Sequence, residues 1–524
     1  MPKVVAWLKE KENKVLILKL MLALCFPLVL CILYCLREGA WIGDLHLGSA
    51  QNNDILFYYK QVEGMVEYGI PQGFFGYNES AALKGSFGVW GPFVLLPWAI
   101  WGKLFGWTMS SPFMCNIVAL SITFALFVWW TRPNLKQMAV SAVMIALFPA
   151  FARYTMSNLA ELFMFCYVLS FYGLAMAYAR KESKAKLIGM FVLASFLVWL
   201  RPYMALLLLL PGFFLFLKHR WLGFLTTAVL GFGNVAIYFL ISHFLTADYF
   251  LQMFDFYLVT SFFEHGFETG VYYFVQQVRN LSGELFGHMK QSFVNGAFMG
   301  SNYWVLFLLC ILIITLIYRL RKKKEKLYSW VCMHYIFTSL FGMTVMIMLM
   351  QKINETSRHI MAFILVGMIL LGCTFEVKLR DLWKPALVAL LCIVLYQCFP
   401  DDGKDYQTPI LIQERYEEQL AWQEINQKIE LTLEQTPSYA NTLIWVFSDK
   451  VEGQAAYMPW RHMLSVPAGM GISCCMDSYL IENWDNLKSR YISTLSDGEI
   501  AQMCEESGFE KIGEACGKVL YKRY

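Results

Sequence analysis

Residues 15–36 read VLILKLMLALCFPLVLCILYCL, an apolar run that is long enough to cross a bilayer as a helix. A basic stretch from Lys3 to Lys14 precedes this run, and no small-residue cleavage site follows it. We therefore interpret it as a retained first transmembrane helix rather than as a signal peptide. This run decides the fold class, because similar runs recur along most of the chain.

Apolar runs of membrane length fill much of the first 400 residues. They lie near residues 15–36, 88–106, 112–131, 136–153, 159–180, 186–200, 203–218, 222–246, 302–319, 328–350, 356–373 and 384–399. The 524 residues are 58% hydrophobic and 16% charged, against about 25% charged in soluble domains, and the mean hydropathy is +0.47. This composition is that of a polytopic membrane protein. It excludes a secreted disulfide scaffold and a disordered chain. It also excludes a nucleic-acid-binding protein, since the net charge is only +4.

Lysine and arginine in the short loops predict the orientation, because such loops face the cytoplasm. The basic clusters are the N-terminus, Arg132/Lys136, Arg180/Lys181/Lys184/Lys186, Lys218/Arg220, Arg319/Arg321/Lys322/Lys323/Lys324/Lys326 and Lys378/Arg380/Lys384. All of these basic clusters lie on the same side of the membrane only if one of the early apolar runs does not span it. Run 88–106 contains Gly91, Pro92 and Pro97 and suits a bent interfacial helix. We therefore predict about eleven transmembrane helices plus interfacial helices, with the N-terminus in the cytoplasm.

This topology predicts a membrane module over residues 1–400 with two large outer loops, 37–111 and 246–302. Residues 401–524 are far less apolar and are predicted to form a small extracytoplasmic α/β domain.

Within the tail, Thr442–Phe447 has the composition of a strand, and Asp497–Ser507 that of a helix closed by Gly508. Lys511–Ala515 and Lys518–Tyr521 flank Cys516-Gly517, which predicts a hairpin.

The first outer loop holds the strongest chemical signal. Asp54 and Tyr58 are four residues apart and share one helix face, and an apolar stripe through Val62 and Met65 continues it, as in an amphipathic helix on the outer leaflet. Asp54 at the start of this helix is either an N-cap residue or a functional acid, and the two roles are compatible. Asp44 is a rival acid, but no Tyr-containing stripe follows it.

These residues resemble the membrane glycosyltransferases of the GT-C superfamily, especially the polyprenyl-phosphate-sugar type that includes protein mannosyltransferases and aminoarabinose transferases. Such enzymes have one helix, an outer loop with an acid, a Tyr and a helix ending in Gly, then a Gly/Pro-containing hydrophobic segment and a Lys-Leu-Phe-Gly-like turn. Here the matching positions are Asp54, Tyr58, Gly69, residues 85–92, residues 103–106, Pro149, Arg153, Asn158, Glu161, Arg201-Pro202 and Ser357-Arg358-His359. The His-Pro-Pro form of the hydrophobic segment, found in several subfamilies, is absent.

The resemblance implies a GT-C-like α-helical fold and hexosyl or pentosyl transfer, with inversion, from an undecaprenyl- or dolichyl-phosphate carrier to a lipid, glycan or protein acceptor in the cell envelope. Asp54 would accept the acceptor's proton, and Glu161 would place the acceptor or act as a second acid. Cations would hold the phosphate as its charge develops. The implied substrate-binding residues are Tyr58, Arg153, Arg201, Arg358 and His359.

Each assignment has a structural alternative. Glu161 is also a first-turn acid that the helix dipole favours. Arg153 and Arg201 can snorkel to the lipid headgroups, and Arg358-His359 can anchor a helix at the interface. The sequence predicts no metal site, since Glu264, His265 and Glu268 are an acidic group with a single His. It leaves a divalent cation open as a cofactor, and the pairing of Cys474, Cys475, Cys504 and Cys516 as well.

Two other functions compete with the enzyme. One is a transporter or flippase of a lipid or polysaccharide, and the other is a non-catalytic assembly protein with a GT-C-like architecture. Transporters tend to show internal repeats and ionisable residues in mid-helix. This sequence shows no repeat, and its charges cluster at helix ends, which favours the enzyme.

Overall fold

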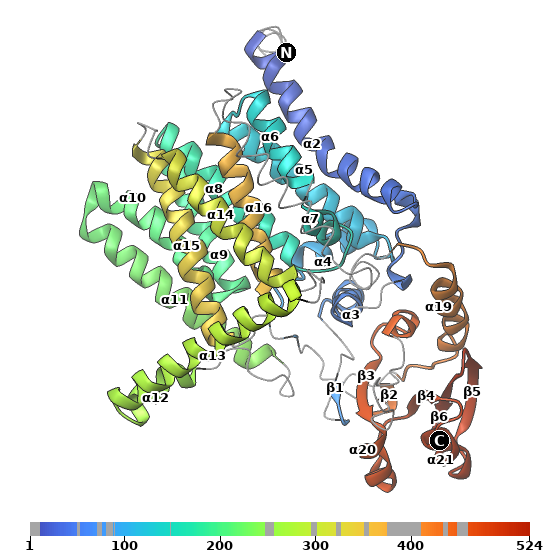
Figure 1. The fold of residues 1–524 in the computed structure, drawn as a ribbon. Helices are drawn as coiled ribbons and strands as arrows, with labels where there is room; N and C mark the ends of the chain where they lie inside the picture. Colours follow the sequence, from blue (N-terminus) through green and yellow to red (C-terminus); the bar gives the residue numbers. More distant parts are fainter. Residues whose placement is uncertain are drawn as a thin grey trace.

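The computed structural model describes thirteen stretches of the chain. They are residues 11–49, 53–70, 76–79, 87–88, 90–146, 148–246, 256–294, 301–320, 326–350, 356–374, 410–432, 439–447 and 460–524. A helical bundle and a mixed sheet with its own helices make up the molecule, and Figure 1 shows the sheet next to one end of the bundle.

The bundle helices follow the apolar runs. They are α2 (Lys11–Arg37), α5 (Ser111–Thr131), α6 (Leu135–Ala146), α7 (Pro149–Thr155), α8 (Glu161–Arg180), α9 (Lys184–Leu200), the 3₁₀ helix η3 (Pro202–Leu208), α10 (Leu209–His219), α11 (Trp221–Leu245), α14 (Ser301–Leu320), α15 (Lys326–Met350) and α16 (Thr356–Thr374). Helix α8 is buried along nearly its whole length and packs against α5, α9, α15 and α16. It is therefore the central helix, and an apolar surface all round suits that place.

Five of the described helices are long and apolar enough to cross a membrane: Glu12–Arg37, Ser111–Thr131, Glu161–Arg180, Pro202–His219 and Trp221–Leu245. The chain is a multi-pass α-helical membrane protein, while the number of about eleven spans stays a prediction. Run 384–399 lies outside the described residues.

The run that we set aside as non-spanning forms only a short helix. Helix α4 (Leu96–Phe105) has 10 residues, or about 15 Å, against a hydrocarbon core of about 30 Å. Run 136–153 is interrupted too, since α7 starts afresh at Pro149 after α6, as proline breaks a helix.

The two outer loops contain helices. In the first, α3 (Asn53–Tyr68) follows the 3₁₀ turns η1 (Ile42–Asp44) and η2 (Leu47–Ser49). It carries Asp54 in its first turn and ends before Gly69, whose φ is +83°, so the predicted amphipathic helix is confirmed. The second loop forms α12 (Tyr257–Glu264) and α13 (Phe267–Val294).

The C-terminal part is built on a six-stranded sheet of order β1-β3-β2-β4-β6-β5. Its later strands are β2 (Thr442–Phe447), β3 (Gly471–Met476), β4 (Tyr491–Leu495), β5 (Glu510–Ala515) and β6 (Lys518–Lys522), with helices α19 (Gln413–Asn426), α20 (Asp477–Glu482) and α21 (Glu499–Glu506) and 3₁₀ turns η5 (Tyr439–Asn441), η6 (Trp460–Ser465) and η7 (Trp484–Asn486). The predicted strand, helix and hairpin are confirmed, and positive φ angles at Cys516 and Gly517 make the hairpin turn.

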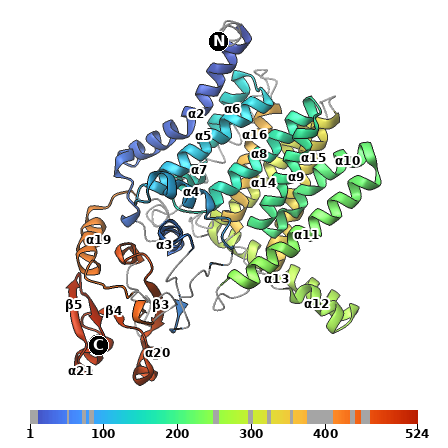
Figure 2. The same ribbon diagram turned by 180° about the vertical axis from the view of Figure 1, so that it is seen from behind.

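One edge strand of this sheet comes from the first outer loop. Strand β1 (Gly76–Tyr77) runs parallel to β3, with Gly76 opposite Ser473 and Tyr77 opposite Cys474. Figures 1 and 2 show this short blue strand beside the orange and red ones from both sides. The sheet is therefore not made from residues 401–524 alone, and the domain boundary near residue 400 stays a proposal.

Candidate functional site

Helix α3 places Asp54 at the meeting point of the bundle and the sheet. Asp54 is half-buried in the first turn of α3. Its charge reaches Tyr77 of β1, where burial, the Cys474 thiol and Asp54 together raise the pKa of the phenol to about 12. Asp54 thus lies near Tyr77, a residue that is 38% exposed.

A buried loop between α7 and α8 is hydrogen-bonded to the start of α3. Within residues 156–160, the amide Nδ2 of Asn158 donates to the carbonyl of Ile55 at 3.1 Å. Asn116 of α5 holds the same loop, donating to the carbonyls of Thr155 and Ser157 at 3.0 and 2.6 Å. Because Ile55 follows Asp54 and Asn158 is three residues before Glu161, these bonds bring the two predicted acids into one region.

Glu161 begins α8 and forms a buried ion pair with Arg201. The distance from Arg201 Nη2 to Glu161 Oε1 is 3.9 Å, and the two residues are 1% and 3% exposed. Arg201 follows the last residue of α9 and precedes Pro202, which explains its extended backbone. Arg201 therefore does not snorkel to the headgroups, and the interfacial alternative for it is wrong.

The ring of Trp90 covers the guanidinium of Arg201. The Arg201 Cζ lies 3.4 Å from the ring centroid, which places a desolvated cation against the negative face of an indole. A tight turn presents this ring, in which the Gly91 amide donates to Gly88 at 2.9 Å and Gly91 takes a φ of +72° that only glycine adopts readily. Tyr203 and Tyr238 also lie near enough to interact with the arginine electrostatically.

The C-terminal part contacts the same helix that carries Asp54. Lys60 Nζ donates to the Val466 carbonyl at 2.5 Å, and the Tyr68 hydroxyl donates to the Ala468 carbonyl at 3.0 Å. The segment after η6 thus lies along α3, and the candidate site sits between the bundle and the sheet region.

The remaining predicted residues divide into three groups. Tyr58 is 9% exposed and lies on the buried face of α3. Arg153 lies in α7, and Arg358 and His359 in the first turn of α16, but their side chains are outside the described part of the chain. The rival Asp44 accepts from the Trp41 amide at 2.5 Å, so it closes a turn.

Sequence reasoning missed two residues of this region. Trp90 was noticed only as part of a hydrophobic segment. Gln61 is 1% exposed, and neither of its amide atoms has a hydrogen-bond partner in the described structure. Gln61 is seven residues after Asp54, two helical turns along one face, and this period is the signal that could have found it.

Among the described residues, no group of three or more His, Cys, Asp or Glu side chains is placed to hold a metal ion. Glu264 and His265 are about half exposed, and the four tail cysteines are free thiols.

Comparisons with known proteins bear on the fold. No protein-family model matches the sequence, and no curated protein sequence does. Among solved structures, the chain is similar to ArnT from Cupriavidus metallidurans bound to undecaprenyl phosphate, with a TM-score of 0.53 and 11% identity, over 96% of this chain and 97% of that one. The apo form of that protein gives a TM-score of 0.49 at 11% identity with the same coverage. The oligosaccharyltransferase AglB from Archaeoglobus fulgidus, solved with an inhibitory peptide and a dolichol-phosphate, gives 0.49 at 12% identity, over 93% of this chain and 70% of that one.

The likeness to undecaprenyl-phosphate-bound ArnT extends over nearly the whole of both chains. The chain thus shares its overall fold with that protein. At 11% identity this likeness concerns the fold, so the activity has to be argued from the site.

Proposed function

We propose that this protein is a GT-C-type glycosyltransferase that moves a sugar from a polyprenyl-phosphate carrier to a cell-envelope acceptor at the outer face of the membrane. The observation that carries this proposal is the environment of Arg201. This cation is almost fully buried, and its Nη2 has no hydrogen-bond partner among the described residues, since Glu161 at 3.9 Å is beyond hydrogen-bond reach. A buried charged donor without an acceptor is costly, and a phosphate oxygen would satisfy it.

The proposed reaction is a single displacement. An acceptor hydroxyl attacks the anomeric carbon, its proton passes to the Asp54 carboxylate, and the bond between that carbon and the phosphate oxygen breaks with both electrons on the phosphate. This attack inverts the anomeric centre. Arg201, with Arg358 and His359 as further candidates, would hold the negative charge that develops on the leaving phosphate.

Glu161 has a positioning role in this scheme. Its carboxylate lies 3.9 Å from Arg201 Nη2 at the start of α8, and the ring of Trp90 contacts the same guanidinium. Arg153 and Tyr58 remain candidates for contacts with the sugar or the acceptor. The likeness in fold to ArnT, which was solved with undecaprenyl phosphate, supports a polyprenyl-phosphate donor. No residue described above defines the sugar or the acceptor.

The test is sugar transfer by the purified protein in nanodiscs with a panel of undecaprenyl- and dolichyl-phosphate sugars. Asp54→Asn should lower turnover by about 10²–10⁴-fold at an unchanged melting temperature. Glu67→Gln is the matched control, because Glu67 is an exposed acid near the other end of the same helix. Activity retained in Asp54→Asn would move the base elsewhere. Absence of turnover with every carrier, in a folded protein, would support the transporter or the assembly protein instead.

A further inference from the structure

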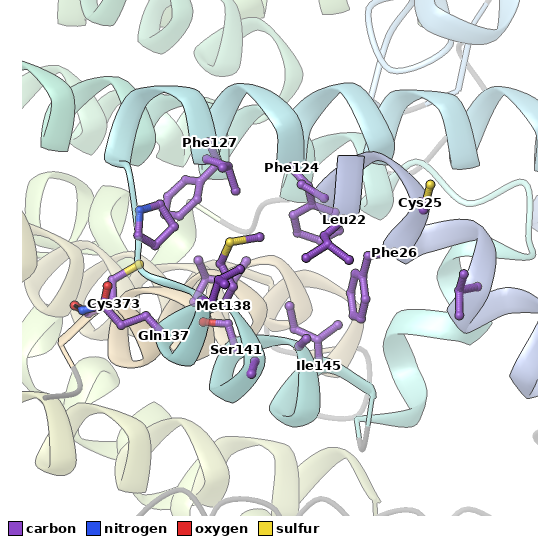
Figure 3. Close-up of a pocket in the computed structure, with 18 residues that line it drawn as sticks. Leu22, Cys25, Phe26, Phe124, Phe127, Gln137, Met138, Ser141, Ile145 and Cys373 are labelled. Carbon is purple, nitrogen blue, oxygen red and sulfur yellow. Dashed lines mark hydrogen bonds between the residues drawn. The ribbon is translucent and has the colours of Figure 1, made fainter. Parts of the chain in front are cut away.

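An apolar cavity of about 370 Å³ opens between α2, α5, α6 and α16. Figure 3 shows Phe124 and Phe127 of α5 and Leu22 and Phe26 of α2 facing Met138 and Ile145 of α6 across it. Leu22 and Val29 on its rim are exposed, so the cavity faces the bilayer between two helices. This shape and lining suit an acyl chain.

A second cavity of about 570 Å³ adjoins the first. The two share Pro133, Gln137 and Cys373 in their walls, and Figure 3 shows Gln137 and Cys373 at one end of the apolar cavity. The second cavity is lined by Arg132 and Arg180. In the shared wall Gln137 Nε2 donates to the Cys373 carbonyl at 2.7 Å, so an apolar space lies directly beside a basic one.

The two arginines that line the second cavity are exposed, and each is fixed in place by a contact other than a carboxylate. Arg180 donates to the carbonyls of Thr131 and Trp130 at the end of α5, and Arg132 Cζ lies 4.4 Å from the ring centroid of Trp129. The acid that follows in sequence, Glu182, pairs with Lys218 instead. In the described residues no ion pair neutralises either arginine, and burial and the neighbouring Arg180 lower the pKa of Arg132.

These cavities lie at the end of the bundle away from the sheet. Figure 1 shows the N-terminus and the start of α6 at one end, with the C-terminal strands at the other. From α15 the second cavity is lined by Leu327 and Tyr328, which follow a Lys/Arg-rich segment of the sequence. The charge rule predicts that this end faces the cytoplasmic leaflet, which is rich in anionic lipids.

We infer that the two adjoining cavities form a binding site for one anionic phospholipid of the cytoplasmic leaflet, with its phosphate between Arg132 and Arg180 and an acyl chain between α2 and α6. This site is separate from the candidate site at Asp54, which lies toward the sheet. It would hold α2 and α6 together where an apolar cavity now separates them.

The test is native mass spectrometry of the full chain released from nanodiscs of phosphatidylglycerol and phosphatidylcholine in equal amounts. The wild type should retain one phosphatidylglycerol in preference to phosphatidylcholine. Arg132→Gln with Arg180→Gln should reduce this preference by about tenfold or more, at roughly fivefold per lost charge near the headgroups. Ala142→Trp, which fills the apolar cavity, should lower retention of the lipid while leaving both arginines in place.

The control is Lys136→Gln with Lys184→Gln, which removes two exposed charges at the same end that do not line the cavity. An equal loss in this control, or equal retention of the two lipids by the wild type, would overturn the inference. So would a double arginine variant that keeps the wild-type preference. Because the readout is lipid retention, it does not depend on the glycosyltransferase proposal.

Discussion

The carboxylate of Glu79 accepts hydrogen bonds from both the backbone amide and the hydroxyl of Ser489, at 2.7 and 2.6 Å. It also accepts from the amide of Lys488 at 3.1 Å. Glu79 lies in the first outer loop, directly after strand β1, and Ser489 lies just before strand β4. The loop that carries Asp54 and the C-terminal sheet are therefore joined by a buried charged acceptor as well as by strand pairing.

Removal of this acceptor should destabilise the junction. Glu79→Ala leaves the amides of Lys488 and Ser489 without their acceptor, and a hydrogen bond to a charged group contributes about 1.5–3 kcal/mol. We expect a lower thermal midpoint in detergent and faster proteolysis between the membrane part and the tail. Glu482→Ala, an exposed acid at the end of α20, should change neither. Equal midpoints for the two variants would contradict the anchoring role.

The buried pair of Glu161 and Arg201 gives a second prediction. Either Glu161→Leu or Arg201→Met alone leaves an uncompensated buried charge, which costs about 3–5 kcal/mol. The double variant should regain much of the lost stability, because both charges are gone, but it should not regain transfer activity. A double-mutant cycle on thermal stability measures the coupling. Additive losses would show that the two side chains do not act as a pair.

Local patterns in the sequence predicted the local elements well. The apolar runs gave the bundle helices, Asp54 and the stripe after it gave α3, and Cys516-Gly517 gave the hairpin. In each case the signal lies within one continuous segment, as a helical or alternating period or as a pair of turn residues. The apolar run 136–153 continues past Pro149, whereas the structure starts α7 there, at a position that the resemblance had already matched.

Contacts between distant segments were not predictable in this way. Strand β1 has two residues and pairs with a strand about 400 positions later, so neither its length nor its pattern distinguishes it from a loop. The burial of Arg201 depends on Trp90, which arrives through a turn at Gly91. The resemblance identified the arginine as a candidate for substrate binding, while its partners come from tertiary packing.

The buried side chain of His462 should make the stability of the protein depend on pH. It is 0% exposed and stacks on Trp422 with 4.9 Å between ring centroids, and burial lowers its pKa to about 4 despite the neighbouring Glu418. The unfolded chain, with an ordinary histidine pKa near 6.5, binds this proton first as the pH falls. Stability should therefore be full above about pH 6.5 and decrease toward pH 4, by about 3 kcal/mol in all.

Glu418 adds to this acid sensitivity at lower pH. Burial raises the pKa of its carboxyl, but the nearby His462 at 3.6 Å and the hydrogen bond from Arg461 outweigh this effect and bring it to about 2, so its contribution is lost below about pH 4.5. Thermal midpoints measured from pH 7 to pH 4.5 should fall in the wild type and fall less steeply in His462→Gln. His265→Gln, at a half-exposed histidine, is the control. Parallel curves for the wild type and His462→Gln would rule out His462 as the source.

The exposed thiol of Cys516 provides the test of membrane orientation. Cys516 lies in the turn between β5 and β6, whereas Cys474, Cys475 and Cys504 are buried. A membrane-impermeant maleimide added to intact cells should label the wild type in its C-terminal fragment, and Cys516→Ser should lose this label, because the predicted topology places the tail outside. Labelling of Cys516 only after permeabilisation would place the sheet in the cytoplasm. Since β1 joins that sheet to the loop of Asp54, the proposed catalytic face would then be cytoplasmic as well, and the predicted cytoplasmic N-terminus would be wrong.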